Sequence, residues 1–426
     1  MPAAGHRAAS RMRTPKELGT NVTALDAAAA TRARGTALLP PALSSLADSV
    51  TESQLCRVHV LAWRDLDDPE AGGSELHAHE VVRRWAAAGL DVTMRTAAAA
   101  GHRAHALRNG YSVVRKAGRY SVFPRTALSG AVGRTGPRDG LVEIWNGMPF
   151  FSPLWAHCPR IVFLHHVHGE MWRMVLPPRL AKLGEMLEFR AAPPVYRRTR
   201  IVTLSQSSKD EIVDLLHLPP HNITVSPPGI DLRYSPGGTR SLAPLILAVG
   251  RLVPVKRFDR LIESAVPLKA RHPGLELVII GEGYERETLE SLIRRRHAAD
   301  WISLPGRVDD DELLNLYRRA WVVTSSSARE GWGMTLTEAA ACGTPAVASR
   351  IAGHLDAVDD GASGLLVDTA VGMTRALDTV LSDQALRARL SEGALVNAAR
   401  FTWDATATLT FEILAAEAAR RHARRR

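Results

Sequence analysis

The chain has 426 residues, of which 46% are hydrophobic and 23% are charged, and this balance excludes a disordered protein and indicates a globular one. The formal net charge of +10 suggests an acidic partner. However, the basic residues are spread along the chain and form no helix-turn-helix, RRM or zinc-finger pattern, so we expect no nucleic-acid partner.

Hydropathy and length set the expected organisation. No apolar run approaches the roughly 20 residues of a membrane span, and the N-terminus lacks a signal-peptide core, so we expect a cytoplasmic protein. The length predicts two domains of about 150–200 residues each. We expect residues 1–50 to be a disordered extension, because they are rich in Ala, Arg, Pro and Thr without a sustained period. The remaining predicted boundaries are a first lobe at 51–228, a hinge at 229–240, a second lobe at 241–400, and a C-terminal helix with a basic tail at 401–426.

The first lobe opens with a predicted strand at 58–63 and a predicted helix at 76–88. Gly72, Gly73 and Glu75 lie between them. A glycine pair between a strand and a helix lets backbone amides approach a ligand at the carboxyl edge of a sheet. We therefore take Gly72 and Gly73 as candidate ligand contacts.

Asp65 and Asp67 form an Asp-x-Asp triplet in the loop that follows the first strand. This spacing can hold a divalent metal on a sugar diphosphate, but it is common by chance. We favour a structural or solvated loop and predict no metal site.

Eight cations gather in one region of the first lobe, interleaved with Val, Trp, Leu and Tyr. This mixture suits contact with an anionic membrane surface, and an ordinary solvated surface is the alternative. The eight are Arg83, Arg84, Arg95, Arg103, Arg108, Arg115, Lys116 and Arg119.

Three histidines, His165, His166 and His168, follow the predicted buried strand at 161–164. A metal cluster, a sugar-binding hydrogen-bond site and ordinary loop histidines are all open interpretations. A metal would require further ligands at a recognisable spacing, and only Glu170 is near.

The second lobe begins with an apolar strand that ends at Arg251, and Lys256 follows five residues later. Two cations at the edge of a sheet can clamp a diphosphate. The next predicted strand and turn contain Gly281, and a later short strand ends in Arg307 and Val308.

The most informative stretch is a glycine turn between a predicted strand at 320–323 and a predicted helix at 335–341. Gly331 and Gly333 let the backbone pass close to a ligand, and the first turn of the helix leaves N–H groups that favour an anion such as phosphate. Glu330 and Glu338 bracket the turn. Both carboxylates can therefore face one small polar ligand from opposite sides.

The spacing of Glu330 and Glu338 resembles the E-x7-E element of family-4 retaining glycosyltransferases of the GT-B fold. The resemblance covers roughly residues 57–418 and is strongest over 244–368. It implies an α/β fold of two Rossmann-like lobes with a ligand cleft between them. It also implies transfer of a sugar from a nucleotide diphosphate to a hydroxyl acceptor, with retention of configuration and without a metal or other cofactor. UDP or GDP is favoured over ADP.

The resemblance also implies roles for individual residues. Arg251 and Lys256 would bind the diphosphate, Glu330 the sugar hydroxyls and Glu338 the ribose. His166, with His165 as the second choice, would contact the donor sugar or the reacting centre. The remaining implied substrate contacts are Gly72, Gly73, Glu75, Gly281, Arg307, Val308, Gly331, Gly333, Met334, Thr335 and Leu336.

Two other function classes remain open. One is a nucleotide-sugar epimerase or hydrolase of the same fold, and the other is a non-catalytic protein that binds anionic surfaces. The acceptor is also open, because lipid-linked, saccharide and natural-product acceptors all fit. We expect a nucleotide sugar and an unidentified acceptor as partners, with the inner face of the membrane as a further one.

Overall fold

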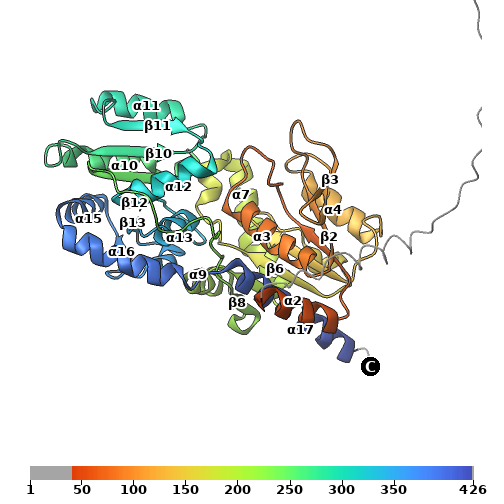
Figure 1. The fold of residues 1–426 in the computed structure, drawn as a ribbon. Coiled ribbons are helices and arrows are strands. Elements are labelled where there is room, and N and C mark those ends of the chain that lie inside the picture. The colour runs from red at the N-terminus through yellow and green to blue at the C-terminus, as the bar shows by residue number, and fades with distance from the viewer. Residues whose placement is uncertain (1–40, 425–426) are drawn as a thin grey trace, which may run out of the picture. The chain divides into compact units, whose positions relative to one another are not determined.

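The computed structural model describes residues 41–424 (Figure 1). This part of the chain contains two sheets, one of eight strands and one of six, each flanked by helices. The predicted class of two Rossmann-like lobes is confirmed. No helix within the described range is both long enough and apolar enough to cross a bilayer.

The first lobe is built on a sheet with the strand order β3-β4-β2-β1-β5-β6-β7-β8, in which only the β3–β4 pair is antiparallel. The strands are β1 (Arg57–Leu61), β2 (Asp91–Thr96), β3 (His105–Arg108), β4 (Tyr111–Arg115), β5 (Gly140–Trp145), β6 (Arg160–Leu164), β7 (Arg200–Thr203) and β8 (Ile223–Val225). The helical segments of this lobe are α3 (Gly73–Ala87), α4 (Val122–Ala131), α5 (Ser152–Trp155), α6 (Met171–Val175), α7 (Pro178–Met186), η1 (Leu187–Ala191), α8 (Ala192–Tyr196), α9 (Gln206–Leu216) and η2 (Pro220–Asn222).

The second lobe has an all-parallel sheet with the order β11-β10-β9-β12-β13-β14. Its strands are β9 (Leu245–Val249), β10 (Glu276–Ile280), β11 (Ile302–Gly306), β12 (Val322–Ser325), β13 (Ala346–Ser349) and β14 (Gly364–Val367). Its helical segments are η3 (Pro254–Lys256), α10 (Phe258–Ala265), η4 (Val266–Leu268), α11 (Arg286–Arg295), α12 (Asp310–Arg319), α13 (Met334–Ala341), α14 (His354–Ala357), α15 (Ala370–Ser382) and α16 (Gln384–Ala398).

The continuous apolar sequence of β9 follows from burial on both faces. Leu245 and Leu247 belong to one hydrophobic core, and Ile246 and Ala248 belong to another. Successive side chains of a strand point to opposite faces, so helices on both sides of the sheet bury the whole strand. This arrangement leaves the carboxyl edge of the sheet as the place where polar side chains can gather.

The chain returns to the first lobe at its C-terminal end, through α17 (Trp403–Ala423). Phe411 of α17 packs edge-on against Trp85 of α3, whose Nε1 donates to the Ala407 carbonyl oxygen at 2.8 Å. The start of α17 lies beside the segment around Gly229 that leads from the first lobe to the second. A Cβ on Gly229 would lie 2.0 Å from the Trp403 nitrogen. Only glycine therefore allows the two connections to run together at this point.

The N-terminal boundary differs from the prediction. Residues 41–50, which we expected to be disordered, belong to the helix α2 (Pro41–Glu52). Leu46 of α2 is fully buried in the same core as Trp85 and Phe411. The segment is ordered because α17 and α3 supply the apolar surface that it covers, and the sequence of the segment gives no sign of that surface. Residues 1–40 of the predicted extension lie outside the described residues.

Candidate active site

A close ion pair marks the carboxyl edge of the second sheet. Lys256 Nζ donates to Glu330 Oε1 at 2.5 Å, and Ser327 Oγ donates to the same oxygen at 2.8 Å. Burial alone would raise the pKa of Glu330, but the Lys256 ammonium and these hydrogen bonds lower it to about 2. Oε2 accepts no hydrogen bond from any described residue, so one oxygen of this carboxylate is available to a ligand.

Arg251 lies beside this pair, in the loop after β9. Its hydrogen bond within residues 41–424 is to the Glu70 carbonyl oxygen, at 3.3 Å. Burial, followed by the neighbouring Arg64 cation, lowers the pKa of Arg251. Because no described carboxylate forms an ion pair with it, the Arg251 guanidinium can accept an anionic ligand without first giving up a partner.

The start of α13 supplies backbone donors. Gly333 caps the helix with φ of 119°, and its carbonyl oxygen accepts from the Leu336 and Thr337 N–H groups. Met334 and Thr335 N–H donate to no acceptor in the described chain, as expected for the first turn of a helix. Two donors and the helix dipole therefore face the turn that holds Glu330.

His354 is a residue of this site that sequence reasoning missed. It is fully buried, its Nδ1 lies 2.8 Å from the Ser349 carbonyl oxygen, and its Nε2 has no partner. Burial lowers the pKa of His354, so the ring is neutral and its Nδ1 carries the donated proton. A Cβ on Gly333 would lie 3.0 Å from the ring. The signal for this histidine was its place one residue after Gly353, at the start of α14, which follows β13.

Glu338 has different partners from Glu330. Tyr317 OH donates to Glu338 Oε2 at 2.9 Å, and Glu338 is 9% exposed. Burial raises the pKa of Glu338 to about 7, although the Tyr317 hydrogen bond opposes the rise. This carboxyl group therefore changes charge near neutral pH, unlike Glu330.

On the first-lobe side, Gly72 caps α3 and Gly73 is its first residue, and Glu75 serves the loop itself. Glu75 Oε2 accepts from the Gly72 N–H at 2.9 Å, and Oε1 accepts from Arg64 Nε at 3.2 Å. This capping arrangement makes α3 begin at Gly73, three residues before the predicted start. Since both carboxylate oxygens are engaged, the structure gives Glu75 a role in holding the loop rather than in direct ligand contact.

The structure separates the two candidate histidines. His165 Nδ1 lies 3.0 Å from Ser74 Oγ, and its ring packs edge-on against His77. His166 instead shares its surroundings with Glu330, Arg251 and other second-lobe charges, and burial lowers its pKa to about 4. Its Nε2 is buried without a partner. The choice of His166 over His165 as the donor contact stays a prediction, because the Nε2 of His165 is also buried without a partner.

Glu188 fixes the histidine loop from behind. Its carboxylate accepts from the His168 and Gly169 N–H groups at 2.7 and 3.1 Å and from Trp172 Nε1 at 2.8 Å. His168 in turn stacks on His166 with ring centroids 4.9 Å apart. Within residues 41–424, no three His, Cys, Asp or Glu side chains gather as a metal site would require.

Predicted residues of the two lobes meet directly. A Cβ on Gly72 would lie 3.6 Å from Arg251 Nε, and one on Gly73 would lie 3.0 Å from Met334 Sδ. A Cβ on Gly331 would lie 2.5 Å from the His165 carbonyl oxygen. Glycines from one lobe thus make room for residues of the other at three separate places.

We expect Gly331→Ala to lower kcat/KM by about tenfold, because the added methyl group meets backbone that can move only if the lobes separate. Steady-state kinetics measures the effect. Gly274→Ala is the control, because its nearest neighbour would be at 3.7 Å, and it should behave like wild type. A kcat/KM of Gly331→Ala equal to that of wild type would mean that this close contact has no role in catalysis.

Several predicted contacts also pack or bond within the protein, and the predicted backbone contacts of Gly281, Arg307 and Val308 stay predictions. Gly281 is required by packing, because a Cβ there would lie 2.0 Å from the Gly250 carbonyl oxygen. Leu336 is 1% exposed, and its N–H is bonded to Gly333, so neither its side chain nor its N–H is open to a ligand. Arg307 is exposed and donates to the Pro69 carbonyl oxygen at 2.7 Å, and Val308 packs against the core.

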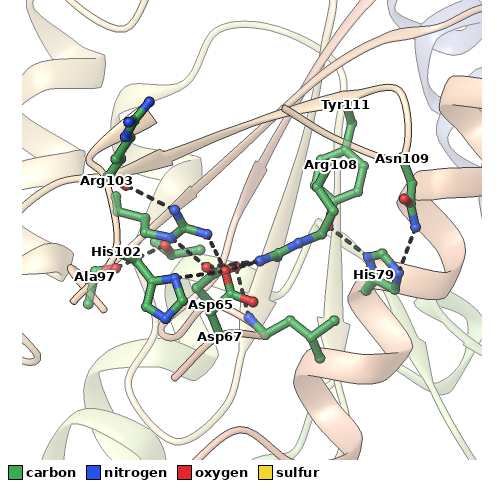
Figure 2. Close-up of polar contacts among 12 residues, drawn as sticks. Asp65, Asp67, His79, Ala97, His102, Arg103, Arg108, Asn109 and Tyr111 are labelled. Atoms are coloured by element: carbon green, nitrogen blue, oxygen red, sulfur yellow. Dashed lines mark hydrogen bonds and ion pairs between the residues drawn. The ribbon is translucent and has the colours of Figure 1, made fainter. Parts of the chain in front are cut away.

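The Asp-x-Asp triplet is occupied by arginines, as Figure 2 shows. Arg108 and Arg115 both contact Asp65 and Asp67, with Arg108 Nη1 2.6 Å from Asp65 Oδ1. Burial would raise the pKa of Asp65, but the two guanidinium groups lower it. The triplet therefore has the structural role that we favoured.

The same contacts correct the predicted membrane-facing cluster of eight cations. Six of the eight are engaged within the protein: Arg83 and Arg84 with Glu80, Arg95 with the Thr135 carbonyl oxygen, Arg108 and Arg115 with the triplet, and Arg119 with Glu70. Arg103 and Lys116 are the exposed remainder. The region therefore offers less free positive surface than its sequence predicted, because Glu80 on the same helix and the more distant Asp65, Asp67 and Glu70 pair with most of its cations.

Comparisons with known proteins show the family and the fold of the chain. The family described as Glycosyltransferase Family 4 matches residues 71–234, and the family described as Glycosyl transferases group 1 matches residues 237–395. The chain is 36% identical over 236 residues to a D-inositol 3-phosphate glycosyltransferase of Acidothermus cellulolyticus, an alignment that covers 50% of this chain and 52% of that protein. At this level of identity, the chain spans about half the length of the curated relatives it matches. A D-inositol 3-phosphate glycosyltransferase 2 of Catenulispora acidiphila is 28% identical over 404 residues, which cover 84% of this chain and 93% of that protein.

Solved structures share the fold. A sucrose-phosphate synthase from Thermosynechococcus elongatus superposes with a TM-score of 0.71 at 18% identity, covering 83% of this chain and 97% of that one. The Anabaena protein HepE in complex with UDP and glucose superposes with a TM-score of 0.67 at 16% identity, covering 85% of this chain and all of that one.

Proposed function

Because the chain belongs to family 4 of the glycosyltransferases with the GT-B fold, we propose that it transfers a sugar from a nucleoside diphosphate donor to a hydroxyl acceptor. The observation that carries this proposal is the meeting of predicted residues from four parts of the chain. Gly72, Gly73 and the His165 carbonyl oxygen lie against Arg251, Met334 and Gly331 of the other lobe.

The donor is a nucleotide sugar, with UDP or GDP as the nucleotide. The Anabaena neighbour was solved with UDP and glucose, which supports this class of donor. Arg251 and the Met334 and Thr335 N–H groups would bind the diphosphate. Lys256 would join them, because an ammonium has three donors and Glu330 uses one of them.

Transfer proceeds with retention of the anomeric configuration. Cleavage of the glycosyl–phosphate bond builds negative charge on the leaving diphosphate, and preorganised cations and amides stabilise that charge. Glu330 Oε2 would accept hydrogen bonds from the sugar hydroxyls, and neutral His166 would contact the same sugar from the first lobe. The departing phosphate would deprotonate the acceptor on the same face, without a covalent intermediate.

Metal independence is part of the proposal. The cationic side chains and the start of α13 supply the positive charge that a divalent ion provides in other transferases. Asp65 and Asp67, the triplet with a metal-binding spacing, already hold two arginines.

The acceptor is a hydroxyl compound that enters on the first-lobe side. The names of the relatives make D-inositol 3-phosphate the first acceptor to test, with lipid-linked, saccharide and natural-product acceptors after it. We place the reaction in the cytoplasm, at the inner face of the membrane.

A thermal-shift screen against UDP, GDP, ADP and their sugars identifies the donor first. Turnover is then measured with and without acceptors, and the anomer of the product is read by NMR. Donor consumed equally fast without any acceptor would indicate the epimerase or hydrolase alternative. Salt-sensitive binding to DNA with no nucleotide affinity would favour the non-catalytic alternative.

Donor affinity should rise with pH across neutrality. Ionised Glu338 would accept from the ribose hydroxyls, and its pKa of about 7 means that this form gains population between pH 6 and 8. We expect a several-fold tighter Kd at pH 8 than at pH 6 by calorimetry, and Glu338→Gln should bind weakly with a flat profile. The effect of pH on folding stability has the opposite sign. The pKa of Glu338 is higher in the folded protein than its ordinary value of 4.5, so the folded state loses stability as pH rises from 4.5 through 7 and Glu338 ionises. A pH-independent Kd in wild type would contradict the ribose role.

A further inference from the structure

The segment between the histidine loop and α8 exposes an unusual set of apolar side chains. Met174 of α6 is 37% exposed, and Leu180, Leu183 and Met186 of α7 are 52%, 44% and 49% exposed. Single exposed apolar residues are normal for a protein surface, and the described chain has others, such as Leu128 of α4 and Leu154 of α5. Four within one short helical hairpin form a patch, which calls for a partner.

The structure fixes the direction in which this patch faces. Gly184 of α7 leaves room for Trp172 of α6, because a Cβ on Gly184 would lie 2.6 Å from the indole ring. Trp172 Nε1 is bonded to the buried Glu188 carboxylate at 2.8 Å. The indole thus occupies the inner side of α7. Leu180 and Leu183 remain open to solvent, with exposures of 52% and 44%.

Cations share the exposed side of α7. Arg179, Lys182 and Arg190 are exposed and form no ion pair with any described carboxylate, whereas Arg173 is paired with Glu185 at 2.7 Å. Residues three or four apart lie on one side of a helix, so Arg179 and Lys182 flank Leu183 and Met186. The surface is therefore apolar and positively charged at the same time.

We propose that the α6–α7 surface, formed by Met174, Arg179, Leu180, Lys182, Leu183, Met186 and Arg190, docks on an anionic lipid bilayer. The apolar side chains would enter the headgroup boundary, while the long Arg and Lys stems keep their charges among the lipid phosphates. A protein partner fits less well, because the cores of protein interfaces are depleted in lysine and in charge. The proposal does not rest on the proposed sugar transfer.

The place of this surface in the fold has a consequence for the first lobe. α6 begins at Met171, two residues after Gly169, whose N–H is fixed by Glu188. Docking would therefore bring the lipid headgroups next to the loop that carries His166. The α6–α7 surface would then be the membrane contact instead of the eight-cation region, because six of those cations already have partners within the protein.

The test is co-sedimentation of the full chain with phosphatidylcholine vesicles, with and without phosphatidylglycerol. We expect binding that needs the anionic lipid and weakens with salt. Leu180→Glu/Leu183→Glu and Arg179→Glu/Lys182→Glu should each reduce it about tenfold or more. The control Leu242→Glu/Val396→Glu adds the same charge at positions that are 98% and 73% exposed, and it should bind like wild type.

Thermal unfolding and UDP binding of each variant check that the fold and the second lobe are intact. No sedimentation of wild type with anionic vesicles would overturn the proposal, as would undiminished binding by Leu180→Glu/Leu183→Glu. Light scattering tests whether a second copy of the chain covers the surface instead. If wild type is a dimer and Leu180→Glu/Leu183→Glu is a monomer, the surface is a dimer interface and the proposal is overturned.

Discussion

Arg251→Ala is expected to lower turnover of the nucleotide sugar by about 10³-fold, which corresponds to about 4 kcal/mol of transition-state stabilisation. Arg251 stands at the carboxyl edge of the second sheet with one hydrogen bond, to a carbonyl oxygen at 3.3 Å. It therefore contributes little to the fold and is free for the charge that develops on the leaving diphosphate. Steady-state kinetics with the donor identified by thermal shift measures the loss.

The control for this change is Arg260→Ala, which removes the same charge from an exposed position on α10 and should keep wild-type kinetics. Turnover by Arg251→Lys should lie between that of Arg251→Ala and that of Arg260→Ala, because lysine keeps the charge but not the forked geometry of a guanidinium. Turnover by Arg251→Ala within a factor of a few of wild type would remove the proposed phosphate clamp.

Lys256→Ala is expected to lower turnover by about 10²-fold or more and also to destabilise the protein. The lysine is a proposed phosphate contact, and its loss leaves the Glu330 carboxylate, 19% exposed, without its cation. In wild type the pKa of Glu330 is about 2, below its ordinary 4.5, so the pair stabilises the fold above pH 4.5 and this contribution is lost as pH falls through 2. The change in pKa corresponds to about 3 kcal/mol at pH 7, to an order of magnitude.

Urea midpoints at pH 7 and at pH 4.5 test the electrostatic part. The difference in urea midpoint between wild type and Lys256→Ala should be large at pH 7. It should become smaller toward pH 4.5, where the unpaired carboxyl group of Glu330 can take a proton. Lys256→Ala/Glu330→Gln should recover stability, because no unpaired charge remains buried, but it should stay inactive. A double variant as unstable as the single one would mean that the lysine acts through packing and not through charge.

The local pattern of the second lobe was readable because its signals lie close together in sequence. The predicted helix at 335–341 differs from α13 by one residue at its start. The apolar strand before Arg251 corresponds to β9, because burial on both faces demands a continuous apolar run. In such a lobe, the chain order of strand, turn and helix already places Arg251, Lys256 and Glu330 at one edge.

The first lobe was harder to predict. The β3–β4 hairpin carries His105, Arg108 and Arg115 in polar sequence, and its arginines seemed to be a free basic surface. Pairing with Asp65 and Asp67 depends on residues about 40–50 positions away, and no local pattern encodes such partners. For the same reason the order of α2 was missed, since α17 comes more than 350 residues later.

The amino-acid sequence by itself determined the alternating α/β elements and the turn from Glu330 to Gly333, because strand periodicity and turn chemistry are local properties. The resemblance of its motifs to a known family supplied the two-lobed architecture and the family. The tertiary structure decided which side chains already have partners. Glu75, Asp65 and most of the first-lobe arginines are bonded within the protein, whereas among the described residues no carboxylate pairs with Arg251 and no donor reaches Glu330 Oε2. Hydrogen bonds and ion pairs join atoms that are near in space, and nearness in space is a property of the folded chain rather than of the order of its residues.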